Sequence, residues 1–214
     1  DGNGRWGLKK FKSRKFRHQK GIKTVEKIIE ASIKKNIKFL TLYTFSTENW
    51  KRPKYEINFL FKLLEDYLAK NINILFKNNI KFKVLGDLNK FPKQLKNSIN
   101  NAIQLTHKNT KLQINLALNY GSKDEIIRSI KLITKKRMTI NINNIEKNLY
   151  TSDMPDPDIL IRTGNTNRLS NFLLWQLSYS EIFFVKKLWP DFNKNDFNKI
   201  LIKFKKIKRN YGKI

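Results

Sequence analysis

The sequence predicts an α/β fold, a single domain whose mostly parallel central sheet is flanked by helices. Apolar runs of strand length alternate along the chain with segments of helical periodicity, and the runs cover residues 39–45, 80–85, 112–118, 158–162 and 181–185. Such alternation is typical of βαβ units, whose crossover helices cover both faces of a parallel sheet. Because 214 residues suit one core and no linker or internal repeat interrupts them, we assign one domain to residues 1–214.

The helical segments follow from apolar residues three or four positions apart. Residues 21–36 place Val25, Ile28, Ile29 and Ile33 on one face. A longer segment begins at Pro53, and its apolar residues recur over roughly five or six turns. We predict further helices at 92–107, 122–136, 143–150 and 193–210, and a loop at 151–158.

Composition excludes several kinds of chemistry. The chain has no cysteine and only two histidines, His18 and His107, which excludes disulfides, thiolate zinc sites, cysteine nucleophiles and imidazole metal clusters. A metal must therefore be held mainly by oxygen, as Mg²⁺ is. No apolar stretch approaches the roughly 18 residues that a bilayer span needs, so we expect a cytoplasmic protein.

The net charge of 45 − 17 = +28 suggests a comparison with nucleic-acid-binding proteins. The lysines, however, are spread over every segment, as a bias toward A/T-rich codons would produce, and such lysines are typical of solvated helix faces. The charge therefore does not favour a nucleic-acid partner, although a basic nucleic-acid-binding protein remains an alternative. The nine arginines are more informative, because six of them lie in three short segments that also carry Gly, Asn, Ser or an acid: Arg5, Arg14, Arg17, Arg52, Arg162 and Arg168.

The first segment is DGNGRW, Asp1 to Trp6, which is followed by Arg14, His18 and Gly21. Its glycines allow backbone N–H groups to turn toward an anion, and Asp1 offers a hard oxygen ligand for a metal. The alternative is an ordinary surface turn, for which Asn-Gly is a common choice. The chain also opens in the middle of a pattern typical of a strand-to-loop motif, so we expect an N-terminal strand before Asp1 to be missing.

The second segment is TFSTENWKRP, Thr44 to Pro53, directly after an apolar strand. Its aromatic and polar side chains lie at the carboxyl end of that strand, where α/β proteins form their sites. The alternative is that Ser46, Thr47 or Asn49 caps the helix behind Pro53. Capping does not explain the tryptophan and the arginine of the segment.

The third segment is RTGNTNRLSNFLLWQ, Arg162 to Gln176, which is followed by Glu181 and WPDF. Arg162 ends an apolar strand, and Arg168 and Ser170 follow across a Gly-containing loop at a predicted helix start. Two guanidinium groups and a hydroxyl make a clamp for a diphosphate. Residues 172–175 indicate core packing. Glu181 precedes two phenylalanines and needs a partner, either a metal or a lysine.

These blocks resemble the signature motifs of the cis-prenyltransferases, most closely those of the bacterial members that make undecaprenyl diphosphate. DGNGRW, His18-x-x-Gly21, FSTENWKRP and RLSNFLLWQ with a later Glu and WPDF keep the family's order from residue 1 to 192. The resemblance implies a Mg²⁺-dependent transferase that joins farnesyl diphosphate to successive isopentenyl diphosphates with cis double bonds; its undecaprenyl product is the precursor of the cell-wall lipid carrier. It also implies a homodimer, an apolar tunnel for the growing chain and a peripheral membrane contact for product release.

The resemblance also implies roles for particular positions. Asp1 and Glu181 would hold Mg²⁺, and Asp1 and Asn49 would be catalytic. The primer diphosphate would be bound by Gly2, Asn3, Gly4, Arg5, Trp6, Arg14 and His18. The site would be lined by Ser46, Thr47, Glu48, Trp50 and Arg52, and isopentenyl diphosphate would be bound by Arg162, Arg168, Leu169 and Ser170. Because a neutral amide is a poor base, we assign Asn49 a positioning role.

Part of the third segment departs from the family pattern. The loop after Arg162 is TGNTNR, where the family commonly has a glutamate, so we assign no role to Asn165, Thr166 or Asn167. The acidic run within residues 153–158 lies in a Pro-broken loop and lacks the DDxxD arrangement of trans-prenyltransferases, so we interpret it as a loop. A catalytically silent subunit of a heteromeric prenyltransferase is the remaining alternative, and the full set of motif residues argues against it.

Overall fold

The computed structural model of the chain describes residues 2–10 and 14–210. The chain falls into two compact units. Unit 1 consists of Asp1–Lys35, Asp156–Ser170 and Leu174–Ile214, and unit 2 consists of Asn36–Pro155 and Asn171–Leu173. Each unit has its own parallel β-sheet and is described by itself.

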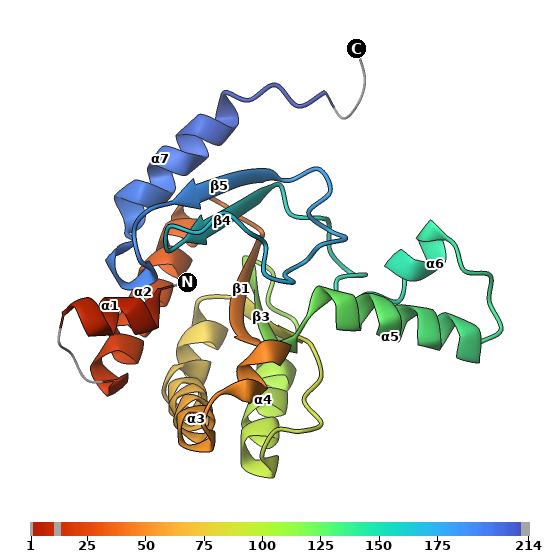
Figure 1. Ribbon diagram of the computed structural model, residues 1–214, viewed down its shortest axis with the longest axis horizontal. Coiled ribbons are helices and arrows are strands. Elements are labelled where there is room, and N and C mark those ends of the chain that lie inside the picture. The colour runs from red at the N-terminus through yellow and green to blue at the C-terminus, as the bar shows by residue number, and fades with distance from the viewer. Residues whose placement is uncertain (1, 11–13, 211–214) are drawn as a thin grey trace. The chain divides into compact units, whose positions relative to one another are not determined.

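The centre of unit 2 is strand β3, Leu112–Tyr120, which pairs in parallel with a neighbour on each side. The neighbours are β1, Phe39–Ser46, which lies beside β3 in Figure 1, and β2, Ile80–Leu85. The strand order is therefore β1-β3-β2. Because both edges of β3 are paired, nearly all of its residues are buried, as expected for the middle of a parallel sheet.

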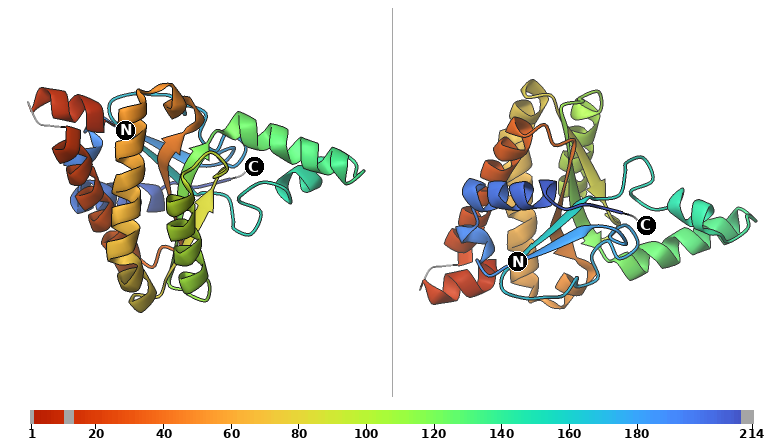
Figure 2. Two further views of the ribbon diagram at one scale, coloured as in Figure 1. Left: turned by 90° about the horizontal axis from the view of Figure 1, so that it is seen from below. Right: turned by 90° about the horizontal axis from the view of Figure 1, so that it is seen from above.

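Helices α3, Lys54–Lys77, and α4, Lys93–Thr106, form the crossovers between these parallel strands. Each follows a proline at its N-cap, Pro53 or Pro92, which has no N–H to leave unsatisfied. The two helices lie side by side and contact each other (Figures 1 and 2). Their buried residues recur every three or four positions, which confirms the predicted helical periodicity: Ile57, Phe61, Leu68 and Leu75 in α3, and Leu95, Ile99, Ala102 and Thr106 in α4.

Helix α5, Ser122–Lys135, and the short helix α6, Ile142–Glu146, follow β3 and extend away from the sheet of unit 2 (Figure 2). The prediction of a helix over 143–150 is wrong at its C-terminal end. Side chains of α5 bind the backbone there, because Arg128 donates to the Asn148 carbonyl at 2.9 Å and Glu125 accepts from the Tyr150 N–H at 2.7 Å. These bonds hold residues 148–150 in turns.

In unit 1, strand β4 (Ile159–Thr163) pairs in parallel with strand β5 (Glu181–Val185), and Ile161 lies opposite Phe183. Helix α2 (Arg14–Lys34) contacts both the short 3-10 helix η2 (Trp189–Asp191) and helix α7 (Lys194–Lys205). Thr24 of α2 donates to the Pro190 carbonyl at 3.3 Å, and Glu30 of α2 forms an ion pair with Lys194. Unit 1 also contains helix α1 (Asn3–Lys9), which contacts α2.

The predicted fold class is confirmed, since the described strands pair in parallel and helices accompany both sheets. Strands β4 and β5 follow each other without a helix between them. The described strands form a three-stranded and a two-stranded sheet. The assignment of one domain to residues 1–214 and of a missing strand before Asp1 stays a prediction. None of the described helices is both long and apolar enough to cross a membrane.

Two helix predictions are wrong in detail. The surface-turn alternative for the Gly-rich opening is also wrong, because residues 3–9 form α1. No helix starts after Ser170: residues 171–179 form bends and turns, and Ser170, Asn171 and Leu173 have φ angles of 54°, 60° and 45°, which an α-helix does not contain. The last helix ends at Lys205 rather than at residue 210.

Gly86, directly after β2, has a φ of +125°, and a Cβ there would lie 2.0 Å from the Leu118 carbonyl oxygen. We expect Gly86→Ala to lower the free energy of unfolding by about 3 kcal/mol or more, because left-handed strain adds to a clash with backbone. Urea unfolding measures the change. The matched control is Gly4→Ala, where a Cβ meets nothing within 4 Å and the expected change is at most about 1 kcal/mol. Equal stability of the two variants would contradict this explanation.

Candidate active site

The glycines of the first segment allow close packing at the start of unit 1. Gly2, the N-cap of α1, has a φ of +119°, and a Cβ there would lie 2.8 Å from a methyl carbon of Leu188. A Cβ on Gly21 would lie 2.8 Å from Oδ1 of Asn3. This Oδ1 is buried and has no hydrogen-bond partner among the described residues. Gly21 therefore lets α2 approach the first turn of α1.

Trp6 and Trp189 connect the helices of unit 1 to η2. Trp6 is buried, and its Nε1 donates to the Asp191 carboxylate at 2.8 Å. Trp189 Nε1 donates to the Gly21 carbonyl at 3.0 Å. These bonds give Trp6 a packing role, and its predicted place beside the primer stays a prediction. Asp191 is the partner that sequence reasoning missed; its only signal was its place in WPDF.

The basic residues of the first segment lie on the helices of unit 1. Arg5 of α1 is exposed, and His18 of α2 is buried with 9% of its surface exposed. Arg14 is the first residue of α2, one helical turn before His18, so the two positions share a face of the helix. Asp1, the predicted catalytic and metal-binding residue, lies outside the described residues.

The third segment, which starts at Arg162, begins at the end of β4. Arg162 lies in β4 and is half-buried, and its Nε donates to the Thr166 hydroxyl at 2.9 Å. Leu169 is half-buried, whereas Arg168 and Ser170 are exposed. The interpretation of residues 172–175 as core is confirmed for two of them, because Phe172 and Leu173 are buried and Phe172 stacks on Tyr43 at 4.4 Å.

Glu181 is the first residue of β5, where its N–H donates to the Asp158 carbonyl at 2.9 Å. It is half-buried and takes part in no described ion pair within residues 2–10 and 14–210, so the lysine alternative is not observed there. Among the same residues, no three acids or histidines gather as a metal site. Mg²⁺ commonly takes one or two carboxylates and completes its shell with water and substrate phosphate. Glu181, as one half-buried carboxylate, fits this mode of Mg²⁺ binding.

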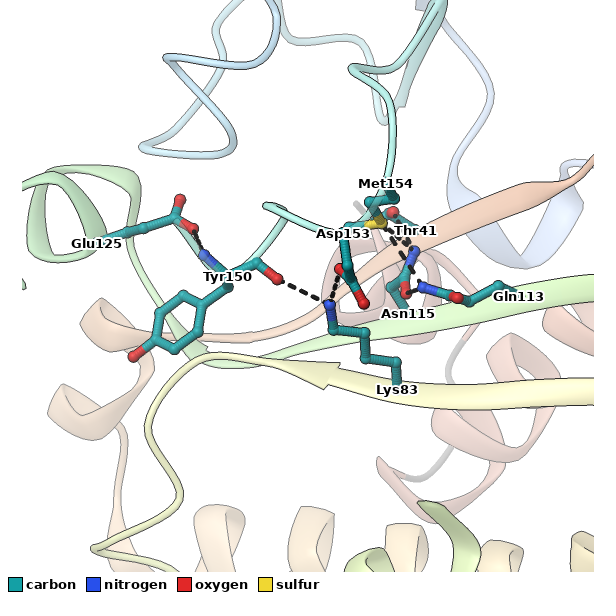
Figure 3. Close-up of polar contacts among 8 residues, drawn as sticks. All are labelled: Thr41, Lys83, Gln113, Asn115, Glu125, Tyr150, Asp153 and Met154. Atoms are coloured by element: carbon teal, nitrogen blue, oxygen red, sulfur yellow. Dashed lines mark hydrogen bonds and ion pairs between the residues drawn. The ribbon is translucent and has the colours of Figure 1, made fainter. Parts of the chain in front are cut away.

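The interpretation of residues 151–158 as a loop is confirmed, and two acids of its acidic run form ion pairs. In unit 2, Asp153 pairs with Lys83 of β2, which also donates to the Tyr150 carbonyl at 3.0 Å (Figure 3). Burial raises the pKa of the Asp153 carboxyl, but the hydrogen bond and charge of Lys83, a backbone hydrogen bond and the charge of Lys81 together outweigh it, so this pKa lies below its ordinary value. In unit 1, Asp158 pairs with Arg209 at 2.5 Å.

The second segment folds as the 3-10 helix η1, Thr47–Lys51, directly after β1. The Ser46 N–H donates to the side-chain Oδ1 of Asn49 at 3.2 Å. The capping alternative is wrong for the helix behind Pro53, because the N-cap of α3 is Pro53 without a side-chain cap. Ser46 is instead the N-cap of η1. The Asn49 amide oxygen accepts a hydrogen bond from the backbone, and a side chain that is fixed in this way suits a positioning role.

Trp50 is held at the end of the central strand. Its Nε1 donates to Oδ1 of Asn119 at 2.7 Å, and the Asn119 amide donates to the Asp87 carbonyl at 2.7 Å. The indole ring also packs against Phe45, Phe61 and Phe91 with ring centroids 5.3 to 6.0 Å apart. Sequence reasoning missed Asn119; the available signal was a polar residue at the end of an apolar strand.

The hydroxyl and carboxylate of η1 lie at the N-terminus of α5. Thr47 donates to the Asp124 carboxylate at 3.2 Å, and Glu48 accepts from the Asn171 amide at 3.0 Å. Asn171 in turn accepts the first N–H groups of α5, that of Ser122 at its carbonyl (2.8 Å) and that of Lys123 at its side chain (2.9 Å). Asn171 therefore caps α5 and positions Glu48, a role that its place in RLSNF did not reveal. Arg52 forms an exposed ion pair with Glu56, one turn further on in α3, at 3.2 Å.

Gly121 leaves room for these groups. A Cβ there would lie 2.5 Å from the Asp124 carboxylate and 2.7 Å from both the Asn171 amide and the Thr47 hydroxyl. Within unit 2, Ser46, Thr47, Glu48, Asn49 and Trp50 lie in or directly before η1, and their role in lining a site stays a prediction. Within unit 1 the structure brings Asn3 and Trp6 onto α2 and η2.

Comparison with known proteins identifies the family. The family model described as putative undecaprenyl diphosphate synthase matches residues 1–212. The chain belongs to this family. The isoprenyl transferases of Oceanobacillus iheyensis and Wolinella succinogenes are 44% and 47% identical over all of this chain, and the matches cover 88% and 94% of their own lengths.

Solved structures agree with this membership. A probable undecaprenyl diphosphate synthase from Campylobacter jejuni is 41% identical with a TM-score of 0.83, over 91% of this chain and 93% of its own. Lavandulyl diphosphate synthase from Lavandula x intermedia, solved with dimethylallyl diphosphate, is 30% identical with a TM-score of 0.94, over 100% of this chain and 95% of its own. The predicted cis-prenyltransferase family and enzyme class are confirmed, and the protein elongates prenyl chains from isoprenoid diphosphates.

Glu48 provides a pH-dependent test of the Asn171 contacts. Burial raises the pKa of the Glu48 carboxyl, but hydrogen bonds from Asn171, Ser46 and the backbone, together with the charge of Lys51, outweigh it, so this pKa lies below its ordinary value. A carboxyl group whose pKa is lowered by folding stabilises the folded state at pH values above its unfolded pKa of about 4.3. This stabilisation is lost as the pH falls through the pKa of the folded state.

We expect Asn171→Gly, which tolerates the φ of 60°, to lower the free energy of unfolding at pH 7 by about 1–2 kcal/mol. The difference from the parent protein should shrink toward pH 3, and the Glu48 pKa should rise, as measured by urea unfolding and a ¹³C carboxyl titration. Asn167→Ala, at an exposed amide of the preceding loop, is the control. A loss that does not change with pH, or a Glu48 pKa that does not move, would show that Asn171 does not act on Glu48.

Proposed function

We propose that the enzyme condenses isopentenyl diphosphate onto farnesyl diphosphate, forms cis double bonds and releases a long-chain polyprenyl diphosphate, namely undecaprenyl diphosphate. The observation that carries the proposal is the match of the family model to residues 1–212, with every motif block in order. We further propose that it acts as a cytoplasmic homodimer, with a peripheral membrane contact that receives its product.

In each cycle the allylic C–O bond of the primer breaks and its diphosphate leaves. A C–C bond forms to isopentenyl diphosphate, and a proton leaves the carbon next to the new bond to complete the double bond. The main requirement is stabilisation of the negative charge on the leaving oxygens. Mg²⁺, when bound, supplies part of this charge stabilisation, and Asp1 and Glu181 are the residues proposed to hold it.

The chain's own groups perform the rest of the work in this proposal. The primer diphosphate is bound by the residues of the first segment, with Arg5, Arg14 and His18 as its charged or polar side chains. Arg162, Arg168 and Ser170 bind isopentenyl diphosphate, because planar guanidinium groups match phosphate oxygens in pairs. Asn49, whose oxygen accepts the Ser46 N–H, orients substrate, and the proton goes to a diphosphate oxygen or to water.

The direct test incubates the full-length protein with farnesyl diphosphate and labelled isopentenyl diphosphate, in Mg²⁺ or in EDTA, and resolves the products by length. We expect Mg²⁺-dependent products that end at the undecaprenyl length. Products of another length would correct the product assignment alone. Absence of incorporation by a folded protein would contradict the proposed activity and favour a silent subunit.

Two variants separate binding from chemistry. Arg162→Lys should raise the KM for isopentenyl diphosphate roughly tenfold, because lysine cannot make the paired bonds of a guanidinium. Asp1→Ala should mainly lower kcat, by about a hundredfold or more, because charge on the leaving group is then less stabilised. Steady-state kinetics measure both, with Arg137→Lys at an exposed arginine of unit 2 as the control. Parental kinetics in both site variants would disprove the site assignment.

A further inference from the structure

The loop that departs from the family pattern folds back on β5. The Gly164 N–H donates to the Lys187 carbonyl at 2.7 Å, and the Asn165 N–H donates to the Val185 carbonyl at 3.1 Å. Gly164 and Asn165 have φ angles of 100° and 54°, so two successive left-handed residues reverse the chain. The reversal is built from fixed backbone contacts within unit 1, and it determines where the next side chain lies.

That next side chain is Thr166, which reaches the arginine at the end of β4. Its hydroxyl oxygen accepts the Nε–H of Arg162 at 2.9 Å. Thr is β-branched and has few χ1 states, so a hydroxyl on this pinned loop is a well-defined acceptor. Thr166 is half-buried, and so is the side chain that it binds.

The position of this bond on the guanidinium matters for anion binding. The guanidinium group is a rigid plane with one N–H on Nε and four on its two terminal nitrogens. A bond at Nε fixes the rotation of this plane about the end of the side chain. A hydroxyl provides this orientation without adding a charge of its own.

We propose that Thr166 is a positioning residue, whose bond to Nε fixes the orientation in which the Arg162 guanidinium binds the diphosphate of isopentenyl diphosphate. The inference rests on the proposed function of Arg162. It assigns a role to a loop residue at which the resemblance to the family implies none.

Thr166→Val removes the acceptor and keeps the side-chain shape. We expect the KM for isopentenyl diphosphate to rise roughly fivefold, with kcat and the KM for farnesyl diphosphate changed less than about twofold. Calorimetric binding of isopentenyl diphosphate to the Mg²⁺-loaded protein should weaken by a similar factor. Thr166→Ser, which keeps the hydroxyl, should restore both values. Asn167→Ala, at the exposed neighbour, is the control, and thermal unfolding checks that all variants are folded.

A double-mutant cycle with Arg162→Lys shows whether Thr166 acts through the arginine. Lysine has no Nε–H, so Thr166→Val should add no further effect in that background. A parental KM in Thr166→Val, or effects of the two changes that simply add, would overturn the inference while leaving the role of Arg162 intact. A parental KM in Arg162→Lys would instead overturn the proposed function of this site.

Discussion

The burial of one parallel strand constrains the rest of unit 2. Strand β3 is paired on both edges, and Leu112 and Asn115 within it are fully buried. Parallel pairing requires helical crossovers, and α3 and α4 supply them for the strands on either side. The carboxyl ends of β1 and β3 then lie at one edge of the sheet, because the two strands run in the same direction. Candidate site residues gather at that edge, where Asn119 holds Trp50 and α5 begins.

Polar groups at that edge are satisfied by partners from distant parts of the chain. The first N–H groups of α5 bind Asn171, which is 48 residues beyond Lys123 in the sequence. The same amide binds Glu48, so one side chain caps a helix and positions a carboxylate of the candidate site. Glycine at position 121 is needed because a side chain there would meet three of these groups. The same contacts of Asn171 therefore cap helix α5 and position Glu48.

The charge of the protein is divided between two kinds of cation. Lysines cover helices and make ion pairs such as those of Lys83 and Lys187, which organise the fold locally. Arginines carry the binding chemistry in our proposal, since a guanidinium can be oriented by one bond and still bind an anion with others. Arg162, with its Nε on Thr166, is the clearest example among the described residues. A net charge of +28 by itself says little about the ligand.

The sequence alone determined the fold class, the strands, the helical periodicity and the family, because apolar spacing and long motif blocks are local properties of the chain. It also identified Arg162, Asn49 and Trp50 as site candidates, since polar residues after an apolar strand are visible without coordinates. Only the tertiary structure decided their partners: Thr166, Ser46 and Asn119. It also replaced the expected helix after Ser170 with turns, because Asn171 in a left-handed conformation caps a helix far from it in sequence. Such contacts depend on chain reversals and on helix ends that meet in space, and no pattern within one segment reports them.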